Sequence, residues 1–245
     1  MTRLNGLVTS LGALVLTAFF AAPAHANLQV MIIDAANPSG VVVKDTYAGQ
    51  SPDAIVFNFA DTDFSFNLQI AASNSPGGAI ATLHADSIVQ ATATGVTSNC
   101  TACAAGFNLM VMVSDTSYNS PLGNGTLTQA VNTNTVAASA ATGNVQFDGY
   151  LVNGGTIFAT GANHVGPATF ASYAVTNNTT QSVGVLNAMN PYTLTEVVGL
   201  HLTNTNQGQA TANLSFAVPE PASILLLGTA MLGLARLRKK MQSRG

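Results

Sequence analysis

The chain has 245 residues, of which 47% are hydrophobic and only 7% are charged, whereas about 25% are charged in a typical globular domain. Between residues 27 and 217, the sequence has one cation, Lys44, and nine carboxylates, which gives this span a formal charge of −8. Proteins bind the phosphate backbone through Lys and Arg, so this charge argues against nucleic acid as a partner. Neutral Thr, Ser, Asn, Gln and Gly hydrate the surface instead, which favours an extracytoplasmic β-protein over a cytosolic enzyme.

The N-terminus has the pattern of a secretory leader. Arg3 supplies a positive start, residues 11–22 form an apolar stretch, and Ala24 and Ala26 make the small-x-small pattern that signal peptidase cleaves. This pattern predicts a signal peptide at 1–26 and a mature chain that begins near Asn27. The alternative, an uncleaved anchor, is disfavoured because the apolar stretch is shorter than the roughly 20 residues that span a bilayer.

The body of the chain, residues 27–217, alternates short apolar segments with turn residues, which is the pattern of strands. In the clearest case, Phe64, Phe66, Leu68 and Ile70 alternate with polar residues and share one face. Asn153-Gly154-Gly155 predicts a tight hairpin turn. Strands are expected at 28–34, 41–43, 54–60, 64–70, 79–83, 107–114, 126–131, 145–152, 156–160, 170–176, 194–202 and 210–216.

One helical alternative lies within this body, at 87–93, where Ile88 and Val89 weaken it because β-branched residues disfavour helix. Many short strands at close spacing predict an all-β fold, a single antiparallel β-sandwich for which a jelly roll is one available topology. At about 190 residues, one domain is the economical count.

Cys100 and Cys103 are the only cysteines of the chain. Their spacing suits a redox motif or half of a zinc site, but two thiols do not complete a tetrahedral zinc site, and export favours oxidation. We therefore expect a local disulfide between them. It would stabilise little because the loop that it closes is short.

Two groups of polar residues are candidate sites. Asp61 and Asp63, with Asp53 nearby, have the oxygen ligands that calcium prefers, but they also suit a turn before a strand, which is the favoured interpretation. His84, His164 and His201 are the histidines of the body. No nucleophile motif accompanies them, so no catalytic residue, metal ligand or cofactor is assigned.

The C-terminal segment, residues 218–245, combines three features in a fixed order. The triplet Pro219-Glu220-Pro221 is followed by an apolar stretch at 224–235 and then by a basic cluster of Arg236, Arg238, Lys239 and Lys240. This order predicts a short transmembrane helix, and by the positive-inside rule its basic flank is expected in the cytoplasm and the body outside. The two prolines favour an extended, accessible linker before the helix.

This order of features resembles the PEP-CTERM sorting domain, also catalogued as the ice-binding protein C-terminal domain. The resemblance implies that Pro219, Glu220 and Pro221 are recognised by an exosortase-type membrane enzyme of a Gram-negative bacterium that makes exopolysaccharide and biofilm. The alternative is an ordinary C-terminal anchor that follows a chance Pro-Glu-Pro. Residues 191–198 are also similar to a Pro-Tyr-Ser-Leu-Thr-Glu-Val-Val-type segment of an uncharacterised PEP-CTERM group, which implies no activity.

These features together predict an exported cell-surface or biofilm-matrix protein that is tethered to the inner membrane before processing. We expect a structural or binding role without enzymatic activity, with extracellular polysaccharide as a candidate partner. The alternative function is a secreted polysaccharide-active hydrolase, which is disfavoured because the chain has no Trp platform. An ice-binding face is a lesser alternative, because the Thr-x-Thr units at 92–94, 133–135 and 203–205 follow no fixed period.

Overall fold

The computed structural model describes nine segments of the chain: 27–34, 38–44, 53–60, 64–75, 77–91, 108–135, 143–170, 177–202 and 207–219. Several predictions made from the sequence lie outside these residues. They concern the leader with Ala24 and Ala26, the calcium candidates Asp61 and Asp63, the pair Cys100 and Cys103, and the C-terminal residues Glu220, Pro221, Arg236, Arg238, Lys239 and Lys240.

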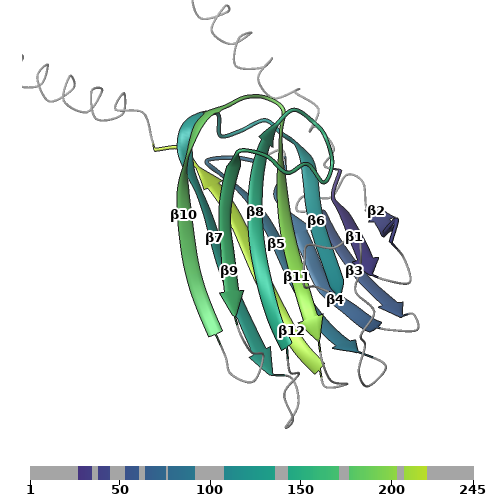
Figure 1. The fold of residues 1–245 in the computed structure, drawn as a ribbon. Coiled ribbons are helices and arrows are strands. Elements are labelled where there is room, and N and C mark those ends of the chain that lie inside the picture. Colours follow the sequence, from purple (N-terminus) through teal and green to yellow (C-terminus); the bar gives the residue numbers. More distant parts are fainter. Residues whose placement is uncertain are drawn as a thin grey trace, which may run out of the picture.

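The described residues form two antiparallel sheets of six strands each, which confirms the predicted all-β sandwich (Figure 1). Sheet A has the order β2-β1-β6-β11-β8-β9, and sheet B has the order β10-β7-β12-β5-β4-β3. The strands are β1 (Gln29–Asp34), β2 (Val41–Lys44), β3 (Asp53–Ala60), β4 (Phe64–Ser73), β5 (Ile80–Ala91), β6 (Leu109–Tyr118), β7 (Gly123–Thr135), β8 (Gly143–Asn153), β9 (Asn163–Phe170), β10 (Asn177–Ala188), β11 (Tyr192–Leu202) and β12 (Gln207–Ala217).

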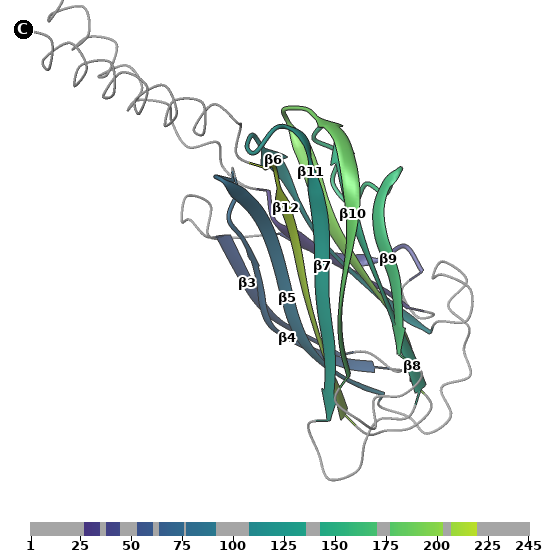
Figure 2. The ribbon, with the colours of Figure 1, turned by 90° about the vertical axis from the view of Figure 1, so that its left-hand side faces the viewer.

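The last eight strands have the connectivity of a jelly roll. β8 pairs with β9, β7 with β10, β6 with β11, and β5 with β12, so the chain folds back on itself like one long hairpin that is wound into two sheets. Successive strands from β5 to β8 alternate between the sheets, as Figure 2 shows from the side of β7 and β10. β3 and β4 extend sheet B beyond β5, and β1 and β2 extend sheet A beyond β6.

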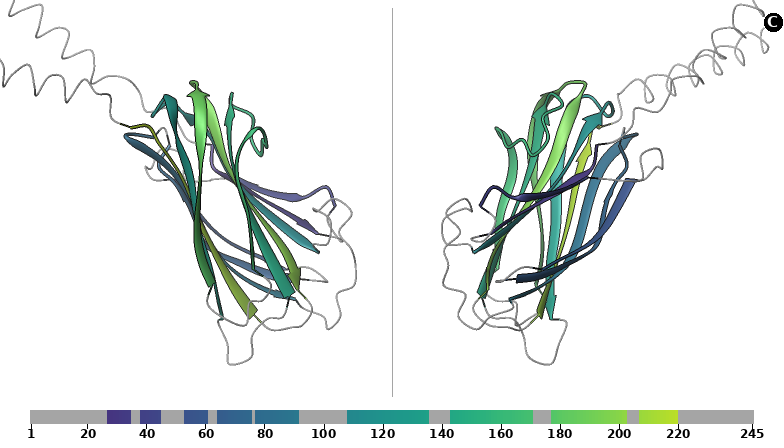
Figure 3. Two further views of the ribbon diagram at one scale, coloured as in Figure 1. Left: turned by 60° about the vertical axis from the view of Figure 1, so that its left-hand side comes forward. Right: turned by 90° about the vertical axis from the view of Figure 1, so that its right-hand side faces the viewer.

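The inner faces of the two sheets supply the core. Figure 3 shows the two sheets packed against each other. In β4, Phe64, Phe66 and Leu68 point inward and are buried, as the alternation predicts. A register shift against β5 between Leu68 and Ile70 interrupts the alternation, and Ala71 is the next buried residue on the inner face. The bulge therefore resets which side chains of β4 reach the core.

Three large aromatic side chains join the two layers near one end of the sandwich. The ring of Tyr118 stacks on that of Tyr192 at 5.4 Å, and Tyr192 meets Phe216 edge-on at 5.8 Å. Tyr118 belongs to β6, Tyr192 to β11 and Phe216 to β12, and all three are fully buried. Because aromatic pairs add to the free energy gained from burial alone, this group helps to fix the two sheets against each other.

The predicted strand at 156–160 and the tight hairpin at 153–155 are wrong. The chain leaves β8 at Asn153 and returns in β9 only at Asn163, through a loop in which Phe158 has a φ of 56°. The backbone N–H of Phe158 donates to Ser114 Oγ (3.1 Å) on β6, and this tertiary contact, which a local pattern does not encode, holds the loop against the outer face of sheet A. The expected strand at 170–176 covers only the last residue of β9, since 171–176 lie outside the described residues. The helical alternative at 87–93 is wrong as well, because β5 runs to Ala91.

Candidate functional site

The sorting triplet follows directly on the last strand of the sandwich. β12 ends at Ala217, Val218 packs against the core, and Pro219 is exposed. Proline cannot donate to a strand ladder, so it is a suitable residue for the end of β12. The jelly roll is therefore complete immediately before the triplet.

A carboxyl group lies inside the sandwich, at Glu196 on β11. In the register of sheet A, Glu196 stands opposite Gly149 of β8 and Val113 of β6, and its side chain is 1% exposed. Gly149 leaves the space that the carboxyl needs, because a Cβ at that position would lie 2.5 Å from Leu214 Cδ1 and 3.4 Å from Gln129 Nε2. A side chain at residue 149 would fill the interior that Glu196 and Gln129 share.

Gln129, on β7 of sheet B, holds the carboxyl from across the core. Its Nε2 donates a 2.5 Å hydrogen bond to Glu196 Oε1. Burial raises the pKa of Glu196 well above its ordinary value, and the nearby charge of Asp148 also raises it, while the Gln129 hydrogen bond acts in the opposite direction. Glu196 Oε2 and Gln129 Oε1 are both buried without a hydrogen-bond partner. Both atoms are acceptors, and a proton on Glu196 Oε2 would supply the donor that this part of the core lacks, so burial and the raised pKa favour a neutral carboxylic acid beside the amide.

A second polar cluster lies on the outer face of the same sheet. Asp148 accepts hydrogen bonds from Gln146 Nε2 (2.7 Å) and pairs with His164 Nε2 (2.7 Å). The His164 ring stacks on Tyr150 with centroids 4.7 Å apart. Burial, and secondarily the charge of Asp148, raises the pKa of Tyr150. Of the three histidines of the body, His164 is the one for which the described residues show a carboxylate partner.

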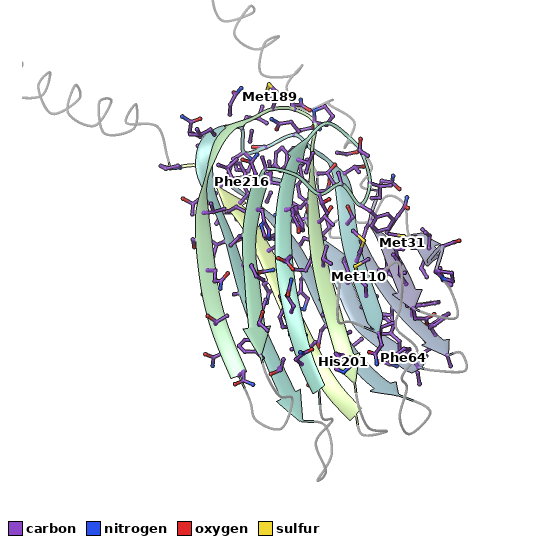
Figure 4. The ribbon with its side chains drawn as sticks, in the orientation of Figure 1. Met31, Phe64, Met110, Met189, His201 and Phe216 are labelled. Atoms are coloured by element: carbon purple, nitrogen blue, oxygen red, sulfur yellow. The ribbon has the colours of Figure 1, made fainter. Side chains whose placement is uncertain are left out.

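The three histidines of the body are separate in the fold. His84 is on β5 of sheet B, where its Nδ1 pairs with Asn213 Oδ1 at 2.6 Å. His201 lies toward the lower end of β11 in Figure 4, opposite Asn144 of β8. His164 pairs with Tyr150, six residues further along β8, which corresponds to about 20 Å. The histidines therefore do not form a common site.

A buried polar network occupies the inner face where β6 meets β4 and β5. The Asp115 side chain is 0% exposed, and it accepts hydrogen bonds from the Asn27 backbone N–H (3.1 Å) and from Ser73 Oγ. Ser73 Oγ also pairs with Tyr118 Oη at 2.9 Å, and Tyr118 donates to the Thr82 carbonyl at 2.6 Å. Sequence reasoning missed this network because an aspartate after an apolar strand is typical of a turn. Its one sequence signal is the run of polar residues that interrupts the apolar pattern of 109–113.

Two further predictions concern metals and ordered water. Within the nine described segments, no three His, Cys, Asp or Glu side chains come together as a metal site. Of the three Thr-x-Thr units, only 133–135 is described, and there Thr133 is fully buried and accepts from Asn177 Nδ2 at 3.3 Å. Its hydroxyl therefore faces protein. Across the same segments, no helix has the length and apolar character needed to cross a membrane; the expected membrane helix at 224–235 lies outside them.

The family described as the PEP-CTERM protein-sorting motif matches residues 217–239, from the last residue of β12 into the basic cluster. The chain carries a PEP-CTERM sorting motif. This motif identifies an extracellular protein that is exported toward the cell surface and processed by an exosortase-type system. The resemblance on Pro219, Glu220 and Pro221 is thus confirmed, and the PEP-CTERM motif begins where the jelly roll ends.

No curated protein matches the chain. Among solved structures, the chain is similar to a Stig cyclase, Fisc, from Fischerella sp. TAU in complex with an indole compound. The two are 12% identical, the similarity covers 76% of this chain and 98% of that chain, and the TM-score is 0.33. At this identity and TM-score, the similarity says nothing about the chemistry of the PEP-CTERM protein.

Proposed function

We propose that the jelly roll is a structural or binding domain of the cell surface or biofilm matrix of a Gram-negative bacterium, without catalytic activity. In this proposal signal peptidase removes residues 1–26, and the helix at 224–235 tethers the chain to the inner membrane until an exosortase-type enzyme processes it. The observation that carries the proposal is the sorting motif at 217–239, which starts at the last residue of β12. Cleavage at a position within the motif, beyond the end of β12, would thus release an intact domain.

The placement of the acidic side chains supports a role other than hydrolysis. Glycoside hydrolases use two carboxyl groups that flank the scissile bond. Glu196 faces the interior and is held by Gln129, whereas Asp148 faces outward from the neighbouring strand and is engaged by His164 and Gln146. These two carboxyl groups lie on opposite faces of sheet A, and a substrate cannot lie between them.

Extracellular polysaccharide is the proposed partner, because the described outer faces are rich in neutral hydrogen-bonding groups. β10 alternates intermediate and exposed residues along Asn177–Gly184, with Thr, Gln and Ser among them. Such a surface can exchange hydrogen bonds with sugar hydroxyls while it remains uncharged. The ice-binding alternative would use the same kind of group but would need a regular spacing.

The first test is the intact mass of the protein in the membrane, surface and medium fractions of its host. A surface or medium species that begins near Asn27 and ends near Pro219 supports sorting and processing. A species that retains the tail through Gly245 and occurs only in membranes refutes exosortase processing and leaves an ordinary tethered domain. Glu220→Ala is the matched variant, for which we expect retention of the unprocessed chain in the membrane.

A second test separates binding from hydrolysis. The processed protein is incubated with polysaccharide from the host matrix, and both co-sedimentation and release of reducing ends are measured. We expect co-sedimentation with no release of reducing ends. Release that increases with time would support the alternative, a secreted polysaccharide-active hydrolase, and thermal hysteresis in ice would support an ice-binding protein.

A further inference from the structure

The start of the expected mature chain lies against a buried carboxylate. Two contacts hold Asn27 in place. Its Oδ1 accepts a hydrogen bond from Gln29 Nε2 at 2.8 Å, and the next residue, Leu28, is 0% exposed. The Asn27 backbone nitrogen is 3.1 Å from Asp115 Oδ1. Asp115 is itself 0% exposed and belongs to the polar network between the sheets. Contacts made by residues 27–29 within the sandwich therefore hold this nitrogen beside the carboxylate.

Cleavage of the leader changes the chemistry of that nitrogen. In the uncleaved chain it is a neutral amide with a single hydrogen. Hydrolysis of the Ala26–Asn27 bond consumes one water, leaves a carboxylate on Ala26, and leaves an amino group on Asn27 that holds the additional proton at neutral pH. α-Amino groups titrate at about 7.7–8.0, so the new terminus is predominantly a cation with three donor hydrogens.

We propose that removal of the leader creates an ion pair between the α-ammonium group of Asn27 and the carboxylate of Asp115, and that the jelly roll reaches its full stability only after this cleavage. The inference rests on the signal-peptidase cleavage of the proposed function. It adds that this cleavage is a maturation step for the fold as well as the removal of the leader.

The charge distribution of the body favours this pair. Lys44 is the only Lys or Arg between residues 27 and 217, so at neutral pH the α-ammonium group adds a second cation to a strongly acidic domain. A buried carboxylate is costly unless charge and hydrogen bonds compensate it. The amide N–H of the uncleaved chain already donates to an ionised acceptor, and cleavage adds the Coulomb attraction between a full positive charge and that carboxylate. The same contact therefore stabilises the folded state more after cleavage than before it.

The effect should extend beyond the terminus, because Asp115 is linked to both sheets. Its second oxygen accepts from Ser73 Oγ of β4 in sheet B, and Ser73 pairs with Tyr118 of β6 in sheet A. Tyr118 then donates to the carbonyl of Thr82 on β5. A carboxylate held in place by the α-ammonium group thus orients the hydrogen bonds that join the layers at this end of the sandwich.

The test compares two chemical forms of the processed protein purified from its host. Selective acetylation of the α-amino group at neutral pH removes the cation but keeps one N–H, whereas reductive dimethylation adds similar bulk and keeps the cation. Because Asn27 is exposed and only Asp115 is buried, we expect acetylation to lower the thermal unfolding midpoint by roughly 2–4 °C and dimethylation to change it little. Mass analysis of the N-terminal peptide confirms each modification.

Asp115→Asn supplies the second half of a double-mutant cycle. In that background we expect acetylation to have no effect on the midpoint, because the carboxylate is gone. An equal acetylation effect in both backgrounds, or equal midpoints for the acetylated, dimethylated and untreated wild type, would overturn the ion pair. If Asp115→Asn does not fold, the comparison of acetylated with dimethylated wild type still decides. An intact mass that begins elsewhere than Asn27 would overturn both this pair and the cleavage position, whereas a correct mass without a shift overturns the pair alone.

Discussion

Replacement of the interior carboxyl by an amide, Glu196→Gln, should remove a pH dependence of stability from the protein. Burial raises the pKa of Glu196 in the folded state, so the folded chain binds this proton more tightly than the unfolded chain does. The contribution of Glu196 to the free energy of unfolding is then largest at low pH. It decreases as the pH rises above the ordinary carboxyl value of 4.5, and it levels off above the raised pKa of the folded state. Glutamine has the shape of the protonated acid and never ionises.

The expected magnitude follows from one proton. While the folded state keeps the proton and the unfolded state has lost it, the free energy of unfolding falls by about 1.4 kcal/mol per pH unit. For a domain of this size that corresponds to about 3–6 °C in the unfolding midpoint per pH unit. Glu196→Gln keeps an oxygen to accept from Gln129 Nε2 and supplies an N–H for Gln129 Oε1, which has no partner in the structure. We therefore expect the variant to match wild type near pH 4 and to be more stable above it.

The assay is thermal unfolding by circular dichroism from pH 4 to pH 9 for wild type and Glu196→Gln. Asp86→Asn is the matched control, since Asp86 is a partly buried carboxylate that binds Thr211 Oγ1 at 3.0 Å on β12 of sheet B. Both substitutions remove one acidic group, so the control separates the loss of the interior carboxyl from a general loss of negative charge. A Glu196→Gln profile that falls as steeply with pH as that of wild type would refute the neutral acid in the core.

Two packing predictions complete the set. Gly149→Ala should lower the free energy of unfolding by about 1–3 kcal/mol through overpacking, because its Cβ would lie 2.5 Å from Leu214 Cδ1. Gly184→Ala, at an open position on β10, is the control, and urea denaturation that ranks the two equally would contradict the argument. Phe216→Ala should cost about 3–5 kcal/mol by opening a cavity beside Tyr192. A change in the urea midpoint that corresponds to less than about 1 kcal/mol would mean that the core at the end of β12 does not depend on this ring.

Local patterns predicted the fold class well, because strands leave a mark in the order of residues. The alternation at Phe64, Phe66 and Leu68 became a strand with these side chains inward, and the strand expected at 107–114 became β6. The same reasoning failed at Phe158, which has a β-compatible sequence around it but a left-handed backbone held by Ser114 of another strand. A contact between residues 44 positions apart has no local signature.

The candidate sites depended on tertiary structure even more. The alternation of Leu194, Glu196, Val198 and Leu200 places the carboxyl on an apolar face, but only the register opposite Gly149 and the approach of Gln129 from the other sheet show that the interior has room for it. The network at Asp115 likewise joins Asn27, Ser73 and Tyr118, which are far apart in the chain.

The sequence by itself therefore determined where this protein goes, and the tertiary structure decided how its domain is held together. A sorting motif is read as a linear order of Pro-Glu-Pro, apolar residues and basic residues at 217–239, so it can be recognised without a fold. The jelly-roll pairing and the burial of Glu196 and Asp115 arise from strands of two sheets meeting across a core. Those contacts depend on register and on space between layers, which are properties of the folded chain and not of any segment of it.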